Sequence, residues 1–289
     1  MVHILLGTQL RRLRKVRGVS VEVAGHAIGT SHIKVSRMEH GRIRFTAREV
    51  TDLLTLYGVT DQHQRQTLLA LAQEANTADW THYYSDLLPS WGATYVGLEQ
   101  ASSVIRTYQP QLVPDLLQTE EIARALQRLR HPSDSVLDIE RRVALQMTRQ
   151  EILTDPGPPR LWAVIDQAAL WRLVGSSALW EQIRHLITIA ELPHVKLQML
   201  PVYSGEYVTI EGPLTILRFA EPELSDIGYL QQQTTALCLD RDEDVQHYRA
   251  LMDHACMLAT SPTATIKYLS AFLANFECLQ GGACLPDVG

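Results

Sequence analysis

Residues 18–41 read GVSVEVAGHAIGTSHIKVSRMEHG, and this stretch decides the fold of the first part of the chain. Gly29 divides it into two segments, because glycine permits backbone turns that other residues resist. Ser20 and Ser31 stand where the two segments begin, and a serine hydroxyl caps a helix by accepting from an amide two or three residues later. The stretch therefore predicts two short helices joined by a turn of about three or four residues, a helix-turn-helix unit.

Helical periodicity extends to both sides of this unit. A first amphipathic helix is expected before Gly18, with basic residues between its apolar positions, and a fourth helix is expected from about Thr46 to Gly58. The positions predicted to face inward in the four helices are Leu6, Leu10, Leu13 and Val16; Val23, Ala24 and Ala27; Val35 and Met38; and Val50, Leu53, Leu54 and Tyr57.

Charge is divided unevenly along the chain. Residues 1–60 hold ten Lys or Arg and four Asp or Glu, a net charge of +6, whereas the remainder holds 16 basic and 28 acidic residues, a net charge of −12. A basic module is what a phosphate backbone attracts, and an acidic body is expected to avoid DNA. Charge alone is equally compatible with an ordinary solvated surface.

The run from Leu6 to Asp61, and within it Gly29 to Gly41, resembles the Cro-like, xenobiotic-response-element (XRE) type of helix-turn-helix domain. The resemblance implies that the third helix enters the major groove of double-stranded DNA, where Arg37 pairs with guanine O6 and N7. It implies that the DNA-binding residues are Ser31, which also caps the helix, the base readers His32, Ile33, Ser36 and Arg37, and the backbone contacts Lys34, Arg42 and Arg44.

Two further positions of the head are interpreted through the same resemblance. Arg14 and Glu39 match a structural ion pair between the first and third helices, so we expect a role in stability for them. Val21 stands where the family usually has Gln, which contacts a phosphate, and this departure weakens one backbone contact.

The body resembles the uncharacterised C-terminal domain that follows this helix-turn-helix type in many actinomycete regulators. The motifs that carry the resemblance are Leu98-Glu99, Ile105-Arg106, Pro114 and Leu116-Leu117-Gln118-Thr119. We expect three parts, a helix-turn-helix domain over residues 1–61, a helical linker over 62–92 and a regulatory domain over 93–280.

Apolar runs predict the secondary structure of the regulatory domain. A strand over 161–165, one or two helices over 167–189 and a strand over 195–200 suggest a strand-helix-strand unit. Three more short strands are expected over 214–219, 227–231 and 235–239, and a final helix from Asp242. The fold class is therefore α+β, an all-α head followed by a larger mixed α+β domain.

Several classes of protein do not fit the sequence. The composition, 46% hydrophobic and 20% charged, is that of an ordinary globular protein. No apolar run approaches the roughly 20 residues of a membrane span, and the short apolar start that turns basic reverses the order of a secretory signal, so a cytoplasmic location without membrane contact is expected. GxSxG, HExxH, Walker and dinucleotide-binding motifs are missing, so neither an enzyme nor a cofactor is predicted.

The four cysteines do not predict a metal site. They lie far apart and without CxxC pairing at Cys238, Cys256, Cys278 and Cys284. His254 is close to Cys256, but no second pair at ligand spacing accompanies them. We expect reduced thiols and no bound metal.

Two segments of the body are candidates for an effector site. The loop over 202–213 follows a strand and presents Tyr203, Glu206 and Tyr207, and the segment from Arg106 to Gln118 adds Tyr108. The alternatives stay open: the loop is a plain connection, and Arg106 pairs internally with Glu99 or Glu120.

These observations predict a sequence-specific DNA-binding transcriptional regulator. A homodimer is expected, because a single groove helix gives too little contact for tight specific binding. The body senses a small molecule or binds a small partner protein, and the resemblance implies the second, since genes of this family often sit beside one. The alternative is a DNA-binding antitoxin or anti-regulator that sequesters such a partner.

Overall fold

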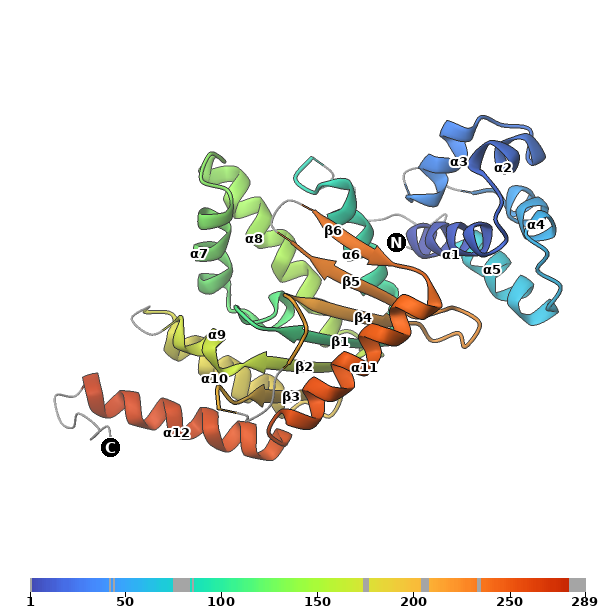
Figure 1. Ribbon diagram of the computed structural model, residues 1–289. Helices are drawn as coiled ribbons and strands as arrows, with labels where there is room; N and C mark the ends of the chain where they lie inside the picture. The colour runs from blue at the N-terminus through green and yellow to red at the C-terminus, as the bar shows by residue number, and fades with distance from the viewer. Residues whose placement is uncertain are drawn as a thin grey trace. The chain divides into compact units, whose positions relative to one another are not determined.

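The computed structural model describes residues 2–41, 43, 45–74, 84, 86–173, 177–203, 208–232 and 235–280 (Figure 1). Its α-helices are α1 (Val2–Val16), α2 (Val21–Ala27), α3 (His32–Glu39), α4 (Ala47–Leu56), α5 (Gln62–Glu74), α6 (Ser90–Ala101), α7 (Glu120–Arg130), α8 (Val136–Gln150), α9 (Gln167–Trp171), α10 (Leu179–Ala190), α11 (Asp242–Leu258) and α12 (Pro262–Gln280). Two short 3-10 helices, η2 (Asp115–Leu117) and η3 (Glu151–Leu153), complete the helical part.

The strands form a mixed sheet. They are β1 (Val104–Gln109), β2 (Arg160–Asp166), β3 (Val195–Leu200), β4 (Leu214–Arg218), β5 (Ile227–Gln231) and β6 (Ala236–Leu239), in the order β3-β2-β1-β4-β5-β6. β2 and β3 run parallel, with Leu161 opposite Val195, and β5 and β6 run antiparallel, with Gly228 opposite Leu239. The α+β class expected from the sequence is confirmed.

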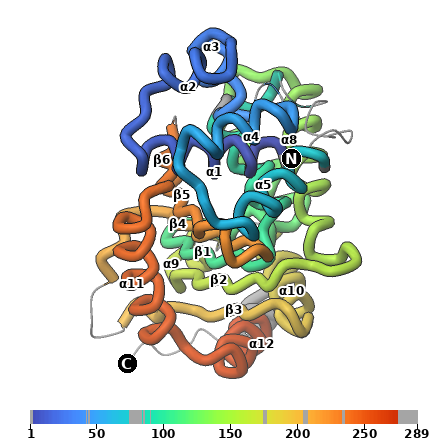
Figure 2. Tube along the Cα trace, turned by 90° about the vertical axis from the view of Figure 1, so that its right-hand side faces the viewer, coloured from blue at the N-terminus to red at the C-terminus, as the bar shows by residue number. Residues whose placement is uncertain are grey.

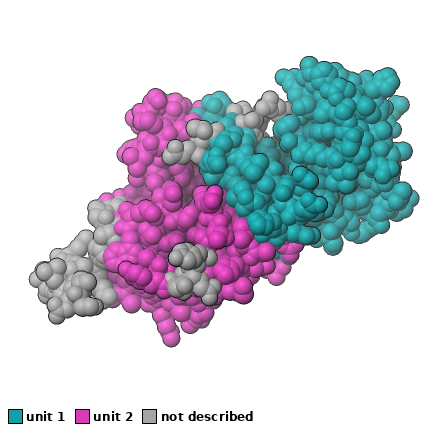
Figure 3. Space-filling view, in the orientation of Figure 1, with its two compact units in different colours: residues 1–105, 216–248 teal, residues 106–215, 249–289 magenta. Residues whose placement is uncertain are grey.

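The chain divides into two compact units, each built from two segments of sequence (Figure 3). Unit 1 comprises Met1–Ile105 and Ile216–Tyr248, and unit 2 comprises Arg106–Thr215 and Arg249–Gly289. Unit 1 thus holds the helical head, α6 and the strands β5 and β6. Unit 2 holds β2, β3 and helices α7 to α10 and α12.

The head has an apolar core at the predicted positions of α3 and α4. Val35, Met38, Val50, Leu53 and Leu54 are all fully buried. α5 packs against α1 and α4, as Figure 2 shows, so it contributes Leu68 to the same core.

Three predicted inward positions of the head are wrong. Val16 is 74% exposed at the end of α1, and in α2 Val23 is 52% exposed and Ala27 is also on the surface. α1 instead buries Ile4 and Leu5 beside Leu6 and Leu10, because α3, α5 and α6 all pack against it. α2 needs only Ala24 and Gly25 inward, since a Cβ on Gly25 would lie 2.9 Å from the Thr30 carbonyl oxygen.

Unit 2 contains the predicted strand-helix-strand unit. β2 leads through α9 and α10 into the parallel strand β3, and α12 covers β3 and α10. Among the helices in the described part of the chain, none combines the length and the apolar character that crossing a membrane requires.

Candidate nucleic-acid interface

The turn between α2 and α3 is fixed by two serine caps. The Ser20 hydroxyl accepts from the Val23 amide, and the Ser31 hydroxyl accepts from the Lys34 amide at 3.2 Å. Gly29 has φ +67°, a left-handed conformation in which a side chain would be strained. Both predicted caps are confirmed, and each contributes about 1 kcal/mol to the helix that it begins.

α3 has one face in the core of the head and one face in solvent. Val35, Met38 and Glu39 are buried, whereas His32 and Arg37 are exposed and Ile33 is 58% exposed. Ser31 is exposed and Ser36 is half-buried on the same outer side. An exposed helix face that combines a branched apolar side chain with hydrogen-bonding groups suits contact with base edges.

The predicted backbone contacts differ in what the structure shows of them. Lys34 donates to Glu49 Oε1 at 2.8 Å, so a phosphate would compete with this carboxylate. Burial raises the pKa of Glu49, but hydrogen bonds from Lys34 and Thr46 outweigh burial and leave the pKa below its ordinary value. Arg42 and Arg44 lie outside the described residues.

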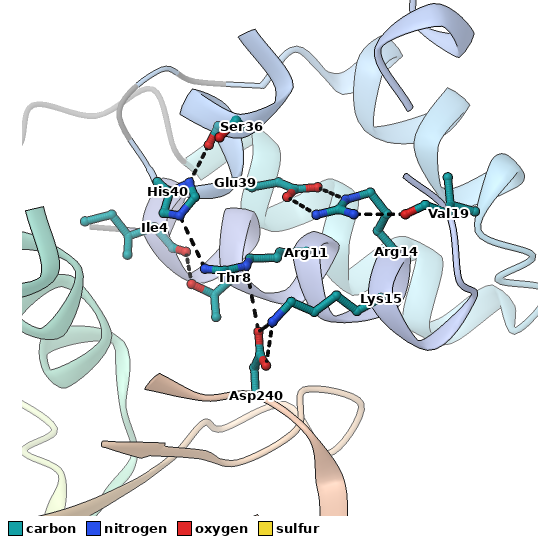
Figure 4. A network of polar contacts seen from close by, with 10 residues as sticks. All are labelled: Ile4, Thr8, Arg11, Arg14, Lys15, Val19, Ser36, Glu39, His40 and Asp240. Carbon is teal, nitrogen blue, oxygen red and sulfur yellow. Dashed lines mark hydrogen bonds and ion pairs between the residues drawn. The ribbon is translucent and has the colours of Figure 1, made fainter. Parts of the chain in front are cut away.

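The pair of Arg14 and Glu39 ties α1 to α3, as the sequence predicts (Figure 4). Arg14 Nε and Nη2 donate to the two carboxylate oxygens of Glu39 at 2.6 and 2.8 Å, and Nη1 donates to the Val19 carbonyl at 2.9 Å. The side chains are only 10% and 2% exposed. The Glu39 hydrogen bond raises the pKa of Arg14, so the guanidinium stays charged beneath the outer face of α3.

The outer side of α1 pairs with acidic residues that follow β6. Lys15 Nζ lies 2.8 Å from Asp240 Oδ2, Arg12 Nη2 lies 2.5 Å from Asp242 Oδ2, and Arg11 Nε lies 4.0 Å from Asp240 Oδ2. Figure 4 shows Lys15 and Arg11 both directed at Asp240. We call Arg11, Arg12 and Lys15 with Asp240 and Asp242 the α1 clamp. No spacing in the sequence indicated these pairs.

Apolar contact supports the α1 clamp within unit 1. A Cβ on Gly97 of α6 would lie 2.5 Å from Ile4 Cδ1, so the glycine allows the two helices to approach closely. Gln9 Nε2 donates to the Ser225 carbonyl at 3.1 Å. α1 therefore belongs both to the head and to the interface of the head with α6 and β6.

The four described candidates for the effector site do not share one environment. Gln118 is fully buried and donates to the Val113 carbonyl at 2.6 Å, while Gln146 and Gln150 donate to its side-chain and backbone oxygens at 2.8 Å each. This network fixes the segment that follows β1. It favours a structural role for Gln118.

The other described candidates differ from Gln118 in exposure and in partners. Tyr203 is 96% exposed, and Tyr108 is 3% exposed. Arg106 donates to Asp253 Oδ1 at 2.6 Å, so its internal partner is neither of the glutamates expected from the sequence. Glu206 and Tyr207 lie outside the described residues.

No metal centre is found in the part of the chain that the structure describes, where His, Cys, Asp and Glu side chains form no group of three or more placed to hold an ion. Cys256 is buried, and burial raises the pKa of its thiol.

Comparison with protein families gives two matches. Residues 93–271 match the model of a domain of unknown function (DUF5753), which covers more than half of the chain, and residues 5–68 match a helix-turn-helix domain. Comparisons with curated proteins and with solved structures gave no match.

Proposed function

The chain belongs to the DUF5753 family and begins with a helix-turn-helix domain, and on this premise we propose that it is a transcriptional regulator that binds specific DNA sequences through α3. The observation that carries the proposal is that α3 has one face buried in the core of the head and the opposite face exposed to solvent. Its inner residues are held by the core and by the buried pair of Arg14 and Glu39, so Ile33 and Arg37 are presented on a rigid support.

The binding unit of this proposal is a homodimer. One groove helix reads only a few base pairs, and two copies related by a two-fold axis read paired half-sites about one helical turn apart. Sedimentation of the full chain with and without operator DNA tests this, and a monomer bound with full affinity would contradict it.

The experiment that tests DNA recognition is fluorescence anisotropy with duplexes from the promoter region of the protein's own gene and with scrambled duplexes. Arg37→Ala is expected to weaken specific binding by about 1–3 kcal/mol and to relax the preference at one base. Arg42→Ala is expected to weaken binding to all duplexes alike. Arg160→Ala is the matched control, because Arg160 is exposed in unit 2. Equal effects of the three variants would refute the assignment.

The DUF5753 domain is proposed to receive the signal that changes DNA affinity. For this, the effector must bind more tightly to one arrangement of the heads than to another, because a ligand indifferent to both shifts neither. The α1 clamp and the Ile4–Gly97 contact support this proposal, because they hold α1 of the head against α6 and against the residues that follow β6.

A small protein partner is the second candidate for this signal. Leu129 of α7 and Val136 and Leu137 of α8 are 77%, 74% and 70% exposed, and α7 packs against α8, so this helix pair offers apolar side chains to a protein partner. Mass spectrometry of the complex purified from its native cell separates the candidates. A stoichiometric small protein supports the partner, and a bound small molecule supports the sensor.

A further inference from the structure

Three neighbouring strands bring two cations to one indole ring in unit 2. Arg106 of β1 has Cζ 4.7 Å from the centroid of Trp162 of β2, and Lys196 of β3 has Nζ 3.5 Å from the same ring. Trp162 and Lys196 are direct partners in the parallel register. We call Arg106, Trp162 and Lys196 the Trp162 cluster, in which each cation is attracted by the ring.

Positive charge exceeds negative charge at the Trp162 cluster. The carboxylate of Asp253 pairs with Arg106, whereas Lys196 has no ion-pair partner within the described ranges. The chain beyond residue 60 has 16 basic and 28 acidic residues, so acidic partners are abundant there. Two cations beside a single carboxylate, which pairs with only one of them, are therefore a local feature that the general charge of the body does not explain.

The guanidinium of Arg106 has unused hydrogen-bonding capacity. Its side chain is 14% exposed, and its Nε is buried without a hydrogen-bond partner among the described residues. Asp253 on α11 is 59% exposed, so its carboxylate sits at the solvent edge of the cluster. An anion arriving from solvent can take the place of this carboxylate and satisfy Nε, whereas a buried N–H without an acceptor is destabilising.

The Trp162 cluster is held in place before any ligand arrives. Trp162 Nε1 donates to Gln198 Oε1 at 2.6 Å, and Gln198 Nε2 donates to the carbonyls of Cys256 and Thr260 at 3.3 and 2.9 Å. These bonds fix the indole to the C-terminal end of α11 and the residues that follow it. A preorganised site loses less conformational entropy on binding.

Tyr108 adds a neutral donor on the same strand. It lies two residues after Arg106, so both side chains are on one face of β1. The side chain is 3% exposed. Burial, with the charge of Asp166, raises the pKa of Tyr108 to about 12, so the hydroxyl keeps its proton at neutral pH.

We propose that the Trp162 cluster binds a small anion, a ligand whose carboxylate or phosphate group displaces Asp253 from Arg106, while the ammonium of Lys196 on the other side of the indole adds to the positive potential. A guanidinium matches the planar geometry of either group, and the ammonium adds a point charge. The role of this anion as an effector rests on the function proposed above, but its binding does not.

The test uses the full chain without DNA. Sodium phosphate and sodium benzoate are titrated separately at constant ionic strength, with sodium chloride as the balancing salt, and binding is followed by calorimetry and by the melting temperature. Saturable binding of at least one probe is expected. A response to phosphate alone assigns a phosphate ligand, and a response to benzoate alone assigns a carboxylate ligand.

Three variants show whether binding occurs at the Trp162 cluster. Lys196→Gln is expected to weaken binding about threefold or more, because the cluster loses one of its two positive charges. Asp253→Asn is expected to tighten binding, because it removes the competing carboxylate. Lys267→Gln, at an exposed lysine of α12, is the matched control and is expected to bind like the wild type.

Two results would overturn the proposal: no saturable binding of either probe, or equal binding by the Lys196 and Lys267 variants. If the anion binds at the Trp162 cluster and DNA affinity stays unchanged, the binding site is supported, but the proposal that this anion regulates DNA binding is refuted.

Discussion

Removing the carboxylate of Glu39 should destabilise the head rather than change its sequence preference. In Glu39→Ala the charged Arg14, only 10% exposed, loses two hydrogen bonds of 2.6 and 2.8 Å and keeps only the bond to the Val19 carbonyl. Leaving one member of a buried ion pair unpaired costs about 3–5 kcal/mol. For a domain of this size, about 4–8 °C of melting temperature is lost per kcal/mol, so a fall of about 12 °C or more is expected.

The assay is thermal unfolding of the full chain by calorimetry, together with DNA binding at a temperature where the variant is still folded. Asp52→Ala is the matched control, an exposed carboxylate of α4 in the same domain. Arg14→Met combined with Glu39→Leu should recover part of the loss, because no charge then stays buried without a partner. A melting temperature of Glu39→Ala equal to that of the control would refute the reasoning, and so would a changed base preference at full stability.

Three further outcomes are expected. Tyr57→Phe should stabilise the head by about 1 kcal/mol in urea unfolding, because the buried hydroxyl of Tyr57 has no hydrogen-bond partner in the described part of the chain; a loss of similar size would show that the hydroxyl is satisfied. Burial lowers the pKa of His185 below its ordinary value of 6.5, so the unfolded chain binds this proton more tightly than the folded chain does. The free energy of unfolding should therefore fall as the pH drops below about 6.5, and it should fall less steeply in His185→Gln. An equal change of the urea midpoint between about pH 7.5 and about pH 5.5 in both proteins would contradict this. Asp240→Asn with Asp242→Asn should leave the salt dependence of DNA affinity unchanged, because the cations of the α1 clamp lie on α1, whereas the predicted DNA-binding residues lie on α3 or beside it. A steeper slope would mean that the clamp's cations reach phosphates.

Local signals were sufficient to predict the helix-turn-helix. The helix caps and the turn depend on residues close in sequence, so the sequence alone predicts them. These residues are Ser20, Ser31 and the left-handed Gly29. The predictions for Val16 and Val23 were wrong because periodicity indicates which side of a helix is apolar but not how much of that side is buried. The buried part depends on how many other helices pack against it.

Two elements that the sequence analysis left out carried usable signals. β1 reads VIRTYQ, which is rich in β-branched and aromatic residues, although Arg and Gln interrupt its apolar pattern. α12 begins with Pro262 directly after Ser261, whose hydroxyl accepts from the Ala264 amide, and proline at a first helical position after a serine is a start signal. The capping box of Thr46 and Glu49 could have been found in the same way.

Contacts between distant residues could not be predicted. Lys15 meets Asp240 across 225 residues of sequence, and Arg106 meets Asp253 across 147. No spacing rule connects such positions, because the path between them depends on how strands order themselves in the sheet. The sequence therefore indicated which residues carry charge in the effector region but not which of them meet.

The net charge of +6 in residues 1–60 overstates the charge that the head offers to DNA. Arg11, Arg12 and Lys15 are paired in the α1 clamp, Arg14 is paired with Glu39, and Lys34 is paired with Glu49. Five of the ten cations are thus paired within the protein, by four carboxylates, of which Glu39 and Glu49 are already counted in the net charge and Asp240 and Asp242 are not. Each phosphate contact contributes about −0.9 to the slope of log affinity against log salt, so the electrostatic part of DNA affinity is set by which cations face the groove rather than by their number in the sequence.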